Sequence, residues 1–143
     1  MSFFSSAAVI SSGMSTQREI MDIIAENLAN INTLETEEGG PYQRKIPIVT
    51  SKQTGEFSFS SMLGKNMYSE VKVSSIQKDD SPPILFYDPT HPLADEKGYI
   101  KKPNISQTME MVRMMDASRA YEANVAVFNT SKSMAQKALQ IGS

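Results

Sequence analysis

Apolar residues recur at alternating spacings of three and four positions near the start of the chain. This spacing places them on one face of an α-helix and is typical of a seam that packs against another helix. Asn30, Asn32 and Thr33 follow the seam, and their short polar side chains suit the end of a helix. We therefore predict a helix over residues 7–31, about 37 Å long. The seam comprises Ala7, Ile10, Met14, Gln17, Met21, Ile24, Leu28 and Ile31.

Residues 104–143 contain no proline and carry a second helical pattern. Asn104 with Gln107 three positions later is typical of a capped helix start, and Gly142 is typical of a helix end. A helix between them is about 57 Å long, too long for the inside of a compact domain of this size. Two interpretations stay open: a helical hairpin with an ordinary core, or a helix that packs against copies or partners in an assembly. One seam reads Met111, Met114, Ser118, Tyr121, Val125, Phe128, Lys132, Ala135 and Leu139, and a second reads Val127, Ser131, Met134, Ala138 and Ile141.

The middle of the chain has a different character, because all seven prolines lie between Pro41 and Pro103. Proline breaks a helix interior at a cost of about 3 kcal/mol, so this part is predicted to be non-helical. The pattern therefore predicts a helix, a small β-like middle and a second helix. The predicted strands are Lys45–Val49, at an edge because Pro47 interrupts it, then Tyr68–Ile76 and Ile84–Tyr87, while residues 50–66 are predicted to form a loop or weak hairpin.

The composition of the 143 residues narrows the possible chemistry. The chain has no cysteine, which excludes disulfides, thiolate metal sites and cysteine nucleophiles, and it has a single histidine. The net charge of −2 gives no general nucleic-acid footprint, and no stretch approaches the roughly 18 apolar residues of a membrane span. The longest early apolar run is residues 7–10 and the first basic residue is Arg18, so no cleaved signal peptide is expected.

One group of titratable side chains lies close together in the sequence around His91. His91 lies near Asp88, Asp95 and Glu96 in sequence, a set that could hold a metal or exchange protons. The alternative is a rigid turn, because an Asp-Pro pair starts the segment and two prolines three positions apart fix its backbone. We favour the turn, and we predict no catalytic, cofactor-binding or metal-binding residues and no enzymatic activity.

Methionine is unusually frequent, with ten residues in the chain and five in the last 40. Its flexible, polarizable side chain suits surfaces that meet several different neighbours, although ordinary core filling explains the pattern equally well.

Several blocks resemble one known family. Residues 21–33, MDIIAENLANINT, resemble the N-terminal signature of bacterial flagellar axial proteins, and residues 39–45, GGPYQRK, narrow the resemblance to the rod. The resemblance is narrowed further, to the proximal-rod proteins, by residues 71–104, 117–124 and 128–134. Positions 52–66 carry no motif of the family. The signature residues are Asn27, Asn30, Asn32, Thr33, Asp88, Pro89, His91, Pro92, Arg119, Tyr121, Glu122 and Asn124.

The resemblance implies a mainly α fold with a small β part. The helical residues 1–35 and 104–143 would pair as a discontinuous coiled-coil domain that forms an inner tube, and residues 36–103 would form a small β-rich outer domain. It implies a structural subunit without a cofactor, exported by the flagellar type III apparatus and polymerised in the periplasm into the drive shaft for motility. The implied partners are copies of the chain, rod proteins of the FlgB, FlgF, FlgG and FliE types, and the export apparatus, with no nucleic acid and no lipid insertion.

Under this interpretation, polymerisation buries apolar side chains of both terminal helices. Two alternatives remain at this point: a cytoplasmic helical binding or chaperone-like module of the export apparatus, and a cell-wall glycan hydrolase using Asp88 and Asp95, for which the sequence offers no convincing acid pair. The expected interface residues are Ile10, Met14, Met21, Ile24, Leu28 and Ile31 in the first helix, and Met111, Met114, Tyr121, Val125, Phe128, Met134 and Leu139 in the last.

Overall fold

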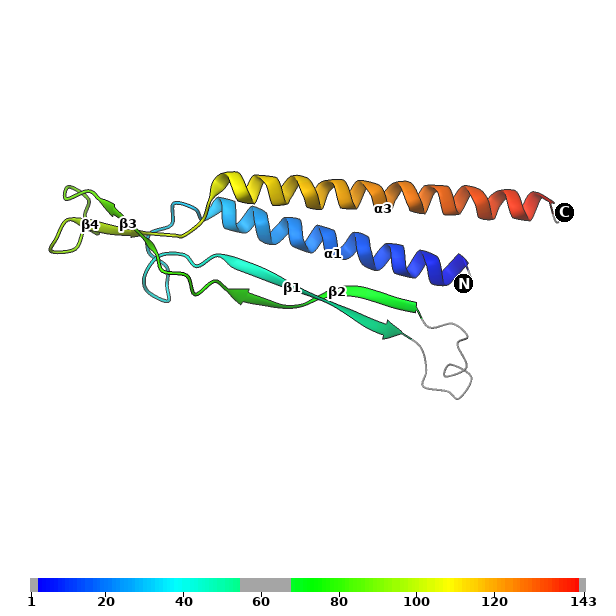
Figure 1. Cartoon of the computed structure of the whole chain (residues 1–143), viewed down its shortest axis with the longest axis horizontal. Helices are drawn as coiled ribbons and strands as arrows, with labels where there is room; N and C mark the ends of the chain where they lie inside the picture. The colour runs from blue at the N-terminus through cyan, green and yellow to red at the C-terminus, as the bar shows by residue number, and fades with distance from the viewer. Residues whose placement is uncertain (1–2, 55–67, 142–143) are drawn as a thin grey trace.

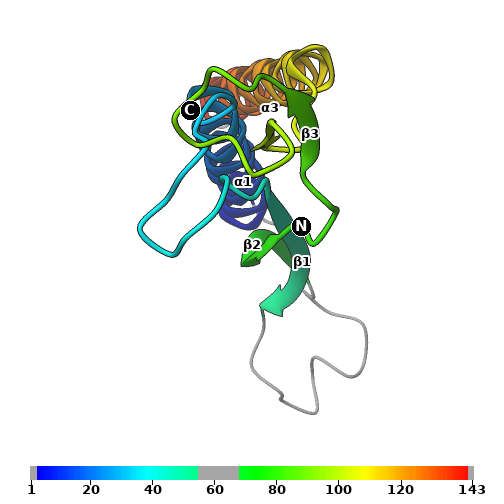
Figure 2. The same ribbon diagram turned by 90° about the vertical axis from the view of Figure 1, so that its left-hand side faces the viewer.

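The chain folds into an elongated molecule built on two long antiparallel helices (Figure 1). The structure is a computed structural model and describes residues 3–54 and 68–141. In Figures 1 and 2, the first helix lies between the last helix and a long β-hairpin, and a short hairpin lies at one end. The predicted fold class, mainly α with a small β part, is confirmed. The elements are α1 (Phe3–Ala29), β1 (Lys45–Thr54), β2 (Tyr68–Lys78), β3 (Ile84–Tyr87), β4 (Tyr99–Lys102) and α3 (Gln107–Ile141).

The two helices contact each other through a heptad seam on α3. Its members are buried or half-buried and follow one another at spacings of four and three, as expected for antiparallel helix packing. The predicted first seam is offset by one residue at alternate positions, beginning with Met111, which is 51% exposed whereas its neighbour Glu110 is 1% exposed. The observed seam comprises Glu110, Met114, Ala117, Tyr121, Asn124, Phe128, Ser131 and Ala135.

Close helix packing depends on a glycine in α1. A Cβ atom at Gly13 would lie 3.2 Å from Nδ2 of Asn124 on α3, tighter than an ordinary contact. Glycine costs about 1 kcal/mol inside a helix relative to alanine, and here the missing side chain leaves room for a neighbouring amide.

The long hairpin pairs β1 with β2 in an antiparallel register that runs from Lys45 opposite Lys78 to Thr54 opposite Tyr68. Residues 50–54, predicted to belong to a loop or weak hairpin, are part of β1, because pairing with β2 extends the strand through this polar stretch. Ser74 is the extra residue of a bulge between Ile48 and Val49 on the other strand, and its Oγ donates to the Ile48 carbonyl at 3.0 Å. Local composition carries little information about such a ladder, since the partner strand lies elsewhere in the sequence.

Two hydroxyl groups of α1 attach the hairpin to the helix. Thr16 Oγ1 lies 2.9 Å from the Val71 carbonyl, and Ser12 Oγ accepts a hydrogen bond from the Val71 amide at 3.2 Å. The backbone of Val71 thus finds on the helix the donor and acceptor that another strand would have supplied. Thr16 is 3% exposed, so this attachment excludes water.

The short hairpin pairs β3 with β4, from Ile84 opposite Lys102 to Tyr87 opposite Tyr99. The predicted strand Ile84–Tyr87 is confirmed at both ends. The rings of Tyr87 and Tyr99 meet edge to face, with centroids 5.2 Å apart. Gly98 precedes β4 with a φ of +78°, and a Cβ there would lie 3.0 Å from the Tyr87 ring, so glycine is required for both conformation and space.

The helix ends differ from the predicted ones by a few residues. The predicted cap at Asn104 is wrong, because the helix begins at Gln107 and the Oγ of Ser106 accepts from the Met109 amide at 3.5 Å. Helix α1 ends at Ala29, where Asn30 Nδ2 donates to the Glu26 carbonyl at 3.0 Å and competes with the next helical turn. The predicted stop at Gly142 lies outside the described residues. Neither described helix is long and apolar enough to cross a membrane.

The apolar core is thin. Among the described residues it consists of Ile23, Ile24, Ile100, Ile105 and Ala117, each at most 7% exposed. The largest fully buried side chains are instead polar, Glu110 and Asn27. A fold with so little apolar burial depends strongly on how these polar groups are paired.

Candidate functional site

Polar side chains from three elements meet where α1 ends, β1 begins and α3 begins. We call this cluster the polar junction. Asn27 lies at its centre, 1% exposed: its Oδ1 accepts from the Lys45 amide at 2.8 Å and from the Tyr42 hydroxyl at 3.1 Å. Its Nδ2 donates to the Lys45 carbonyl at 2.9 Å. The amide therefore pairs with the backbone of β1 as a neighbouring strand would. The members of the polar junction are Asn27, Tyr42, Arg44, Lys45, Glu110 and Arg113.

The buried carboxylate of the junction comes from the first turn of α3. Glu110 is 1% exposed, and its Oε1 accepts from Arg44 Nε at 2.7 Å and from Arg113 one turn further along the helix. Its Oε2 lies 3.4 Å from Asn27 Nδ2, which connects α3 directly to α1. Removing a charge from water is costly, so such a carboxylate is tolerated only with cations and hydrogen bonds around it. Every buried polar side-chain atom in the described part of the chain has a partner.

The phenol of Tyr42 is held in its neutral form. Burial, with smaller contributions from the negative charges of Glu26 and Glu110, raises the pKa of Tyr42 to about 12. The hydroxyl therefore stays a hydrogen-bond donor to Asn27 throughout the physiological pH range. Lys45 forms an ion pair with Glu26, which adds a second connection between β1 and α1.

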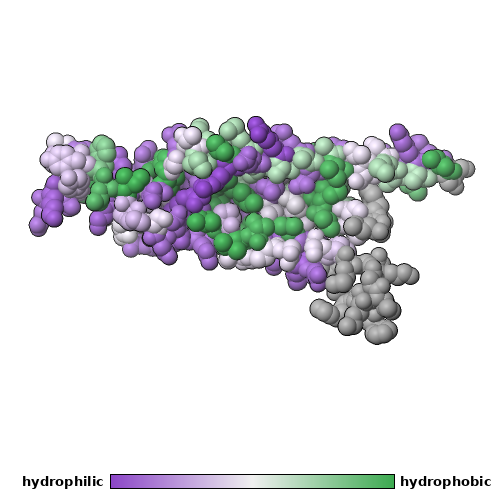
Figure 3. Space-filling view, in the orientation of Figure 1, coloured by the Kyte–Doolittle hydropathy of each residue, from purple (hydrophilic) through white to green (hydrophobic). Residues whose placement is uncertain are grey.

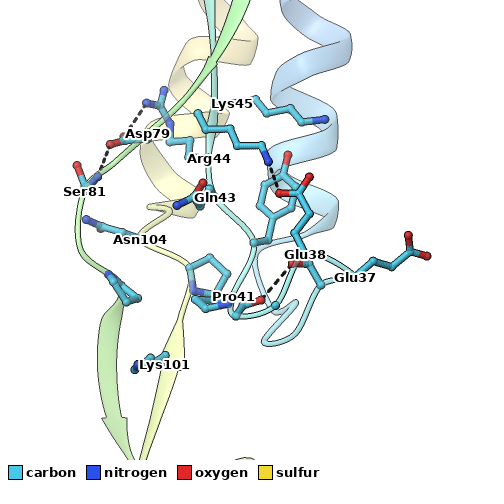
Figure 4. Close-up of a pocket in the computed structure, with 17 residues that line it drawn as sticks. Glu37, Glu38, Pro41, Gln43, Arg44, Lys45, Asp79, Ser81, Lys101 and Asn104 are labelled. Carbon is cyan, nitrogen blue, oxygen red and sulfur yellow. Dashed lines mark hydrogen bonds and ion pairs between the residues drawn. The ribbon is translucent and has the colours of Figure 1, made fainter.

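An open groove of about 710 Å³ lies beside the junction (Figure 4). The loop before β1, the end of β2 and the segment after β4 form its walls. Hydrogen bonding from Lys78 lowers the pKa of Glu38, and hydrogen bonds from Ser81, with a smaller effect of Arg44, lower the pKa of Asp79. Figure 4 shows Asp79 lying between Arg44 and Ser81. Both acids are therefore engaged as anions, which suits a structural clamp more than an acid–base pair.

The segment around His91 forms the rigid turn that we favoured. Asp88 Oδ1 accepts from the Thr90 amide at 3.1 Å and from its hydroxyl at 2.7 Å, and these bonds lower the pKa of Asp88. Nδ1 of His91 accepts from the Leu93 amide at 3.1 Å. Asp95 Oδ1 accepts from two backbone amides further along, which lower its pKa in turn. Within residues 3–54 and 68–141, no three His, Asp or Glu side chains converge to hold a metal ion.

The signature residues of the two helices have distinct surroundings. Asn27 belongs to the polar junction, and Thr33 Oγ1 donates to Asn30 Oδ1 at 3.1 Å in the turn that follows α1. Asn124 lies beside Gly13 at the helix contact. The remaining signature positions of these helices divide into the exposed Asn32, Arg119 and Glu122 and the half-buried Tyr121.

The expected interface residues also divide by exposure. Ile24 is 4% exposed within the single chain, so it belongs to the intramolecular core. The three most exposed are Met111 at 51%, Met134 at 67% and Leu139 at 76%. The other members are half-buried: Ile10, Met14, Met21, Leu28, Ile31, Met114, Tyr121, Val125 and Phe128.

Sequence reasoning missed the polar junction. Ile20, Ile24 and Asn27 follow one another at spacings of four and three, so an amide occupies the apolar face of α1. That position is the signal that could have indicated a buried partner for Asn27. Nothing local to Arg44 or Glu110 indicated that they would meet, because 66 positions separate them.

Two segments of the chain match known protein families. Residues 9–34 match the family described as flagella basal body rod protein, and residues 96–141 match the family described as flagellar basal body rod FlgEFG protein C-terminal. These two matches cover parts of α1 and the segment that contains β4 and α3. The chain is thus a structural protein of the flagellar basal-body rod and not an enzyme.

Curated relatives define the family more closely. A flagellar basal-body rod protein FlgC of Borreliella burgdorferi is 43% identical over 149 aligned positions, which cover 99% of this chain and 98% of the relative. The FlgC of Bacillus subtilis is also 43% identical, with 99% of each chain covered. The FlgC of Escherichia coli is 37% identical over 94% of this chain and 93% of the relative. The chain belongs to the FlgC family of flagellar basal-body rod proteins.

Proposed function

We propose that this chain is a proximal-rod subunit that leaves the cytoplasm through the flagellar type III export apparatus without a cleaved signal. In the periplasm it polymerises with copies of itself and with rod proteins of the FlgB, FlgF, FlgG and FliE types. Family membership supports the structural role, and it disfavours the alternative of a cytoplasmic chaperone-like module. The proximal position, the export route and the individual partners are the content of the proposal.

One observation carries the assembly function: the large apolar residues of a second seam on α3 stay exposed in the described part of the chain. Its heptad members Val127, Met134 and Ile141 are 52%, 67% and 88% exposed. Fully burying a large apolar side chain contributes about 1.5–3 kcal/mol, so a row of such contacts repeated between subunits stabilises a polymer strongly. The exposed Ala138 and the half-buried Ser131 complete the seam, and Ser131 also belongs to the seam that contacts α1.

We propose that the two parts of the chain occupy different positions in the rod. The helical residues 1–35 and 104–143 form the inner tube, and residues 36–103 form the outer β-rich part. The long hairpin does not hang freely from the helices, because Val71 is bound to Ser12 and Thr16 and the junction holds the first residue of β1.

The polar junction then has a mechanical role in this function. Its hydrogen bonds require defined directions, so they set the position of the β part relative to both helices. Apolar contacts alone tolerate sliding more easily. A shaft that transmits torque needs subunits that do not shear internally, and a satisfied buried network supplies that rigidity.

The experiment is to complement a deletion strain with Met134→Asp, which places a charge on the exposed seam. The matched control is Gln136→Asp, an equal charge at an exposed polar position of the same helix. We expect the Met134→Asp chain to be exported but absent from isolated basal bodies, and the control to build rods. Normal rods with Met134→Asp would contradict the assigned seam, and retention of the wild-type chain in the cytoplasm would contradict the export route.

A further inference from the structure

The two long helices contact each other through heptad seams, and such a seam repeats itself every seven residues. Figure 3 shows hydrophobic residues at intervals along the molecule on this face, so hydrophobic burial alone marks no single position along the helix axes. A purely apolar seam can be displaced by one heptad, about 10 Å, and still bury apolar side chains. The register of α1 against α3 therefore needs another determinant.

Two contacts define the observed register. Nδ2 of Asn27 lies 3.4 Å from Oε2 of Glu110, and a Cβ atom at Gly13 would lie 3.2 Å from Nδ2 of Asn124. Fourteen residues, or two heptads, separate the two contacts on each helix. The antiparallel helices thus keep the same register over this whole interval.

The layer halfway between these contacts combines Ile20 with Ala117. Seven residues from Asn27 along α1 lead to Ile20, and seven residues from Glu110 along α3 lead to Ala117. Both side chains line a cavity of about 320 Å³ that also borders β1, and Ala117 is 5% exposed. Three successive layers therefore match a polar group with a polar group, a large side chain with a small one, and a glycine with an amide.

Displacement by one heptad mismatches these layers in both directions. In either direction Glu110 moves about 10 Å away from Asn27 and Arg44. In one direction its carboxylate comes opposite Ile20, and in the other direction the Asn124 amide comes opposite Ile20. Each displacement places a polar group against an apolar side chain that offers it no hydrogen bond, which is unfavourable in a helix contact.

The seam with α1 is the main packing contact of α3. Among the helices and strands in the described part of the chain, α3 packs against α1 alone. The segment before α3 adds the buried Ile105, and the polar junction adds the bond from Arg44 Nε to Glu110 at 2.7 Å. This bond belongs to the same layer as Asn27. The position of α3 along its axis therefore depends chiefly on how its seam matches α1.

We infer that the three layers form a register key, which admits one alignment of α1 with α3 and opposes displacement by one heptad. A buried polar residue in a heptad seam fixes register in this way at a cost in stability. The inference concerns the single chain, and its value to a shaft under load rests on the proposed function. The register key comprises Asn27 with Glu110, Ile20 with Ala117, and Gly13 with Asn124.

The absence of cysteine allows the register to be read from intramolecular disulfides. Continuing the observed register by one heptad places Ser6 opposite Ser131, and displacement would bring Ala138 there instead. Two reporters are built in the full chain: Ser6→Cys with Ser131→Cys, and Ser6→Cys with Ala138→Cys. Both are oxidised at low protein concentration, and intramolecular disulfides are quantified by peptide mapping. Since a disulfide requires Cα atoms within about 7 Å, we expect the Ser131 reporter to exceed the Ala138 reporter several-fold.

The decisive comparison changes one layer of the key. Asn124→Ala removes the amide that lies beside Gly13, and the smaller side chain fits beside Ile20 in the displaced register. It should raise the yield of the Ala138 reporter several-fold. The matched control Asn129→Ala makes the same change at an exposed position of α3 and should leave the yield unchanged. No rise with Asn124→Ala, or an equal rise in the control, would overturn the inference.

The polar layer is tested by adding Asn27→Leu and Glu110→Leu to Asn124→Ala. This triple variant removes every polar group of the key, so the two reporters should reach comparable yields. Circular dichroism shows whether its helices form, and if they do not, the result with Asn124→Ala decides. A rise only in the triple variant would assign the register to the polar junction alone and contradict the three-layer key. Because the purified single chain is tested, failure of the key leaves the rod function standing.

Discussion

Replacing Glu110 by alanine removes the only carboxylate that is buried among the described residues. The change leaves Arg44, whose side chain is 14% exposed, without its closest anion, and it removes the link between α3 and Asn27. Breaking a buried ion pair from one side costs about 3–5 kcal/mol. Two features moderate this cost: Arg44 keeps Asp79 at 3.6 Å, and Arg113 is half-exposed, where an ion pair contributes about 1 kcal/mol or less. We therefore expect a loss of about 3 kcal/mol in the free energy of unfolding.

The assay is urea unfolding followed by circular dichroism of the helices. The control is Glu122→Ala on the exposed face of the same helix, where the change in free energy of unfolding should stay within about 0.5 kcal/mol. A double variant, Glu110→Met with Arg44→Met, should lose less stability than the sum of the two single variants, because neither charge is left unpaired. If Glu110→Ala costs no more than the control, the junction does not stabilise the fold and the reasoning is refuted.

Three further predictions concern separate parts of the fold. Gly98→Ala should lower the free energy of unfolding by about 1–2 kcal/mol, because a residue with a side chain is strained at a φ of +78°. Gly39→Ala should cost less, because its φ is +86° but the space around it is open. Equal costs would mean that the contact of the new Cβ with the Tyr87 ring has no effect. Thr16→Val should cost about 1 kcal/mol and speed amide exchange near Val71, and unchanged exchange there would mean that the hydroxyl does not attach β2. The pKa values of Asp88 and Asp95 are lowered on folding, so the unfolded chain binds more protons at acid pH, and the stability that these turns contribute is present above pH 3.8 and is lost as the pH falls through the folded pKa values. Titration of the carboxyl groups by NMR measures the two folded pKa values. Values at or above 3.8 would contradict the prediction.

The sequence predicted the helices well because their signals are local. The three-and-four spacing of apolar residues and the confinement of proline to positions 41–103 placed both helices within a few residues of their observed ends. Ile84–Tyr87 was predicted at both ends, since a short apolar run follows directly after two prolines. The rigid turn around His91 followed from the Asp-Pro pair, whose geometry is set by residues within the turn.

The polar junction and the other features that the sequence did not predict depend on contacts between residues far apart in the chain. Asn27 and Glu110 are separated by 83 positions, so neither carries a local sign of its partner. Residues 50–54 form a strand only because β2 lies opposite. Ser106 caps α3 although Asn104 has about the same capping preference. The observed seam on α3 begins at Glu110 instead of Met111, because ion pairing makes burial of this acid favourable. A pattern of hydrophobic residues cannot predict a buried acid.

The requirement for this chain in rod assembly follows from its role as a structural subunit of the rod. It is tested most directly by deleting its gene and examining basal bodies isolated from the deletion strain and from a complemented strain by electron microscopy. We expect non-motile cells whose basal bodies lack a rod, with the rod and the protein recovered together after complementation. Motile cells with complete rods in the deletion strain would contradict the account.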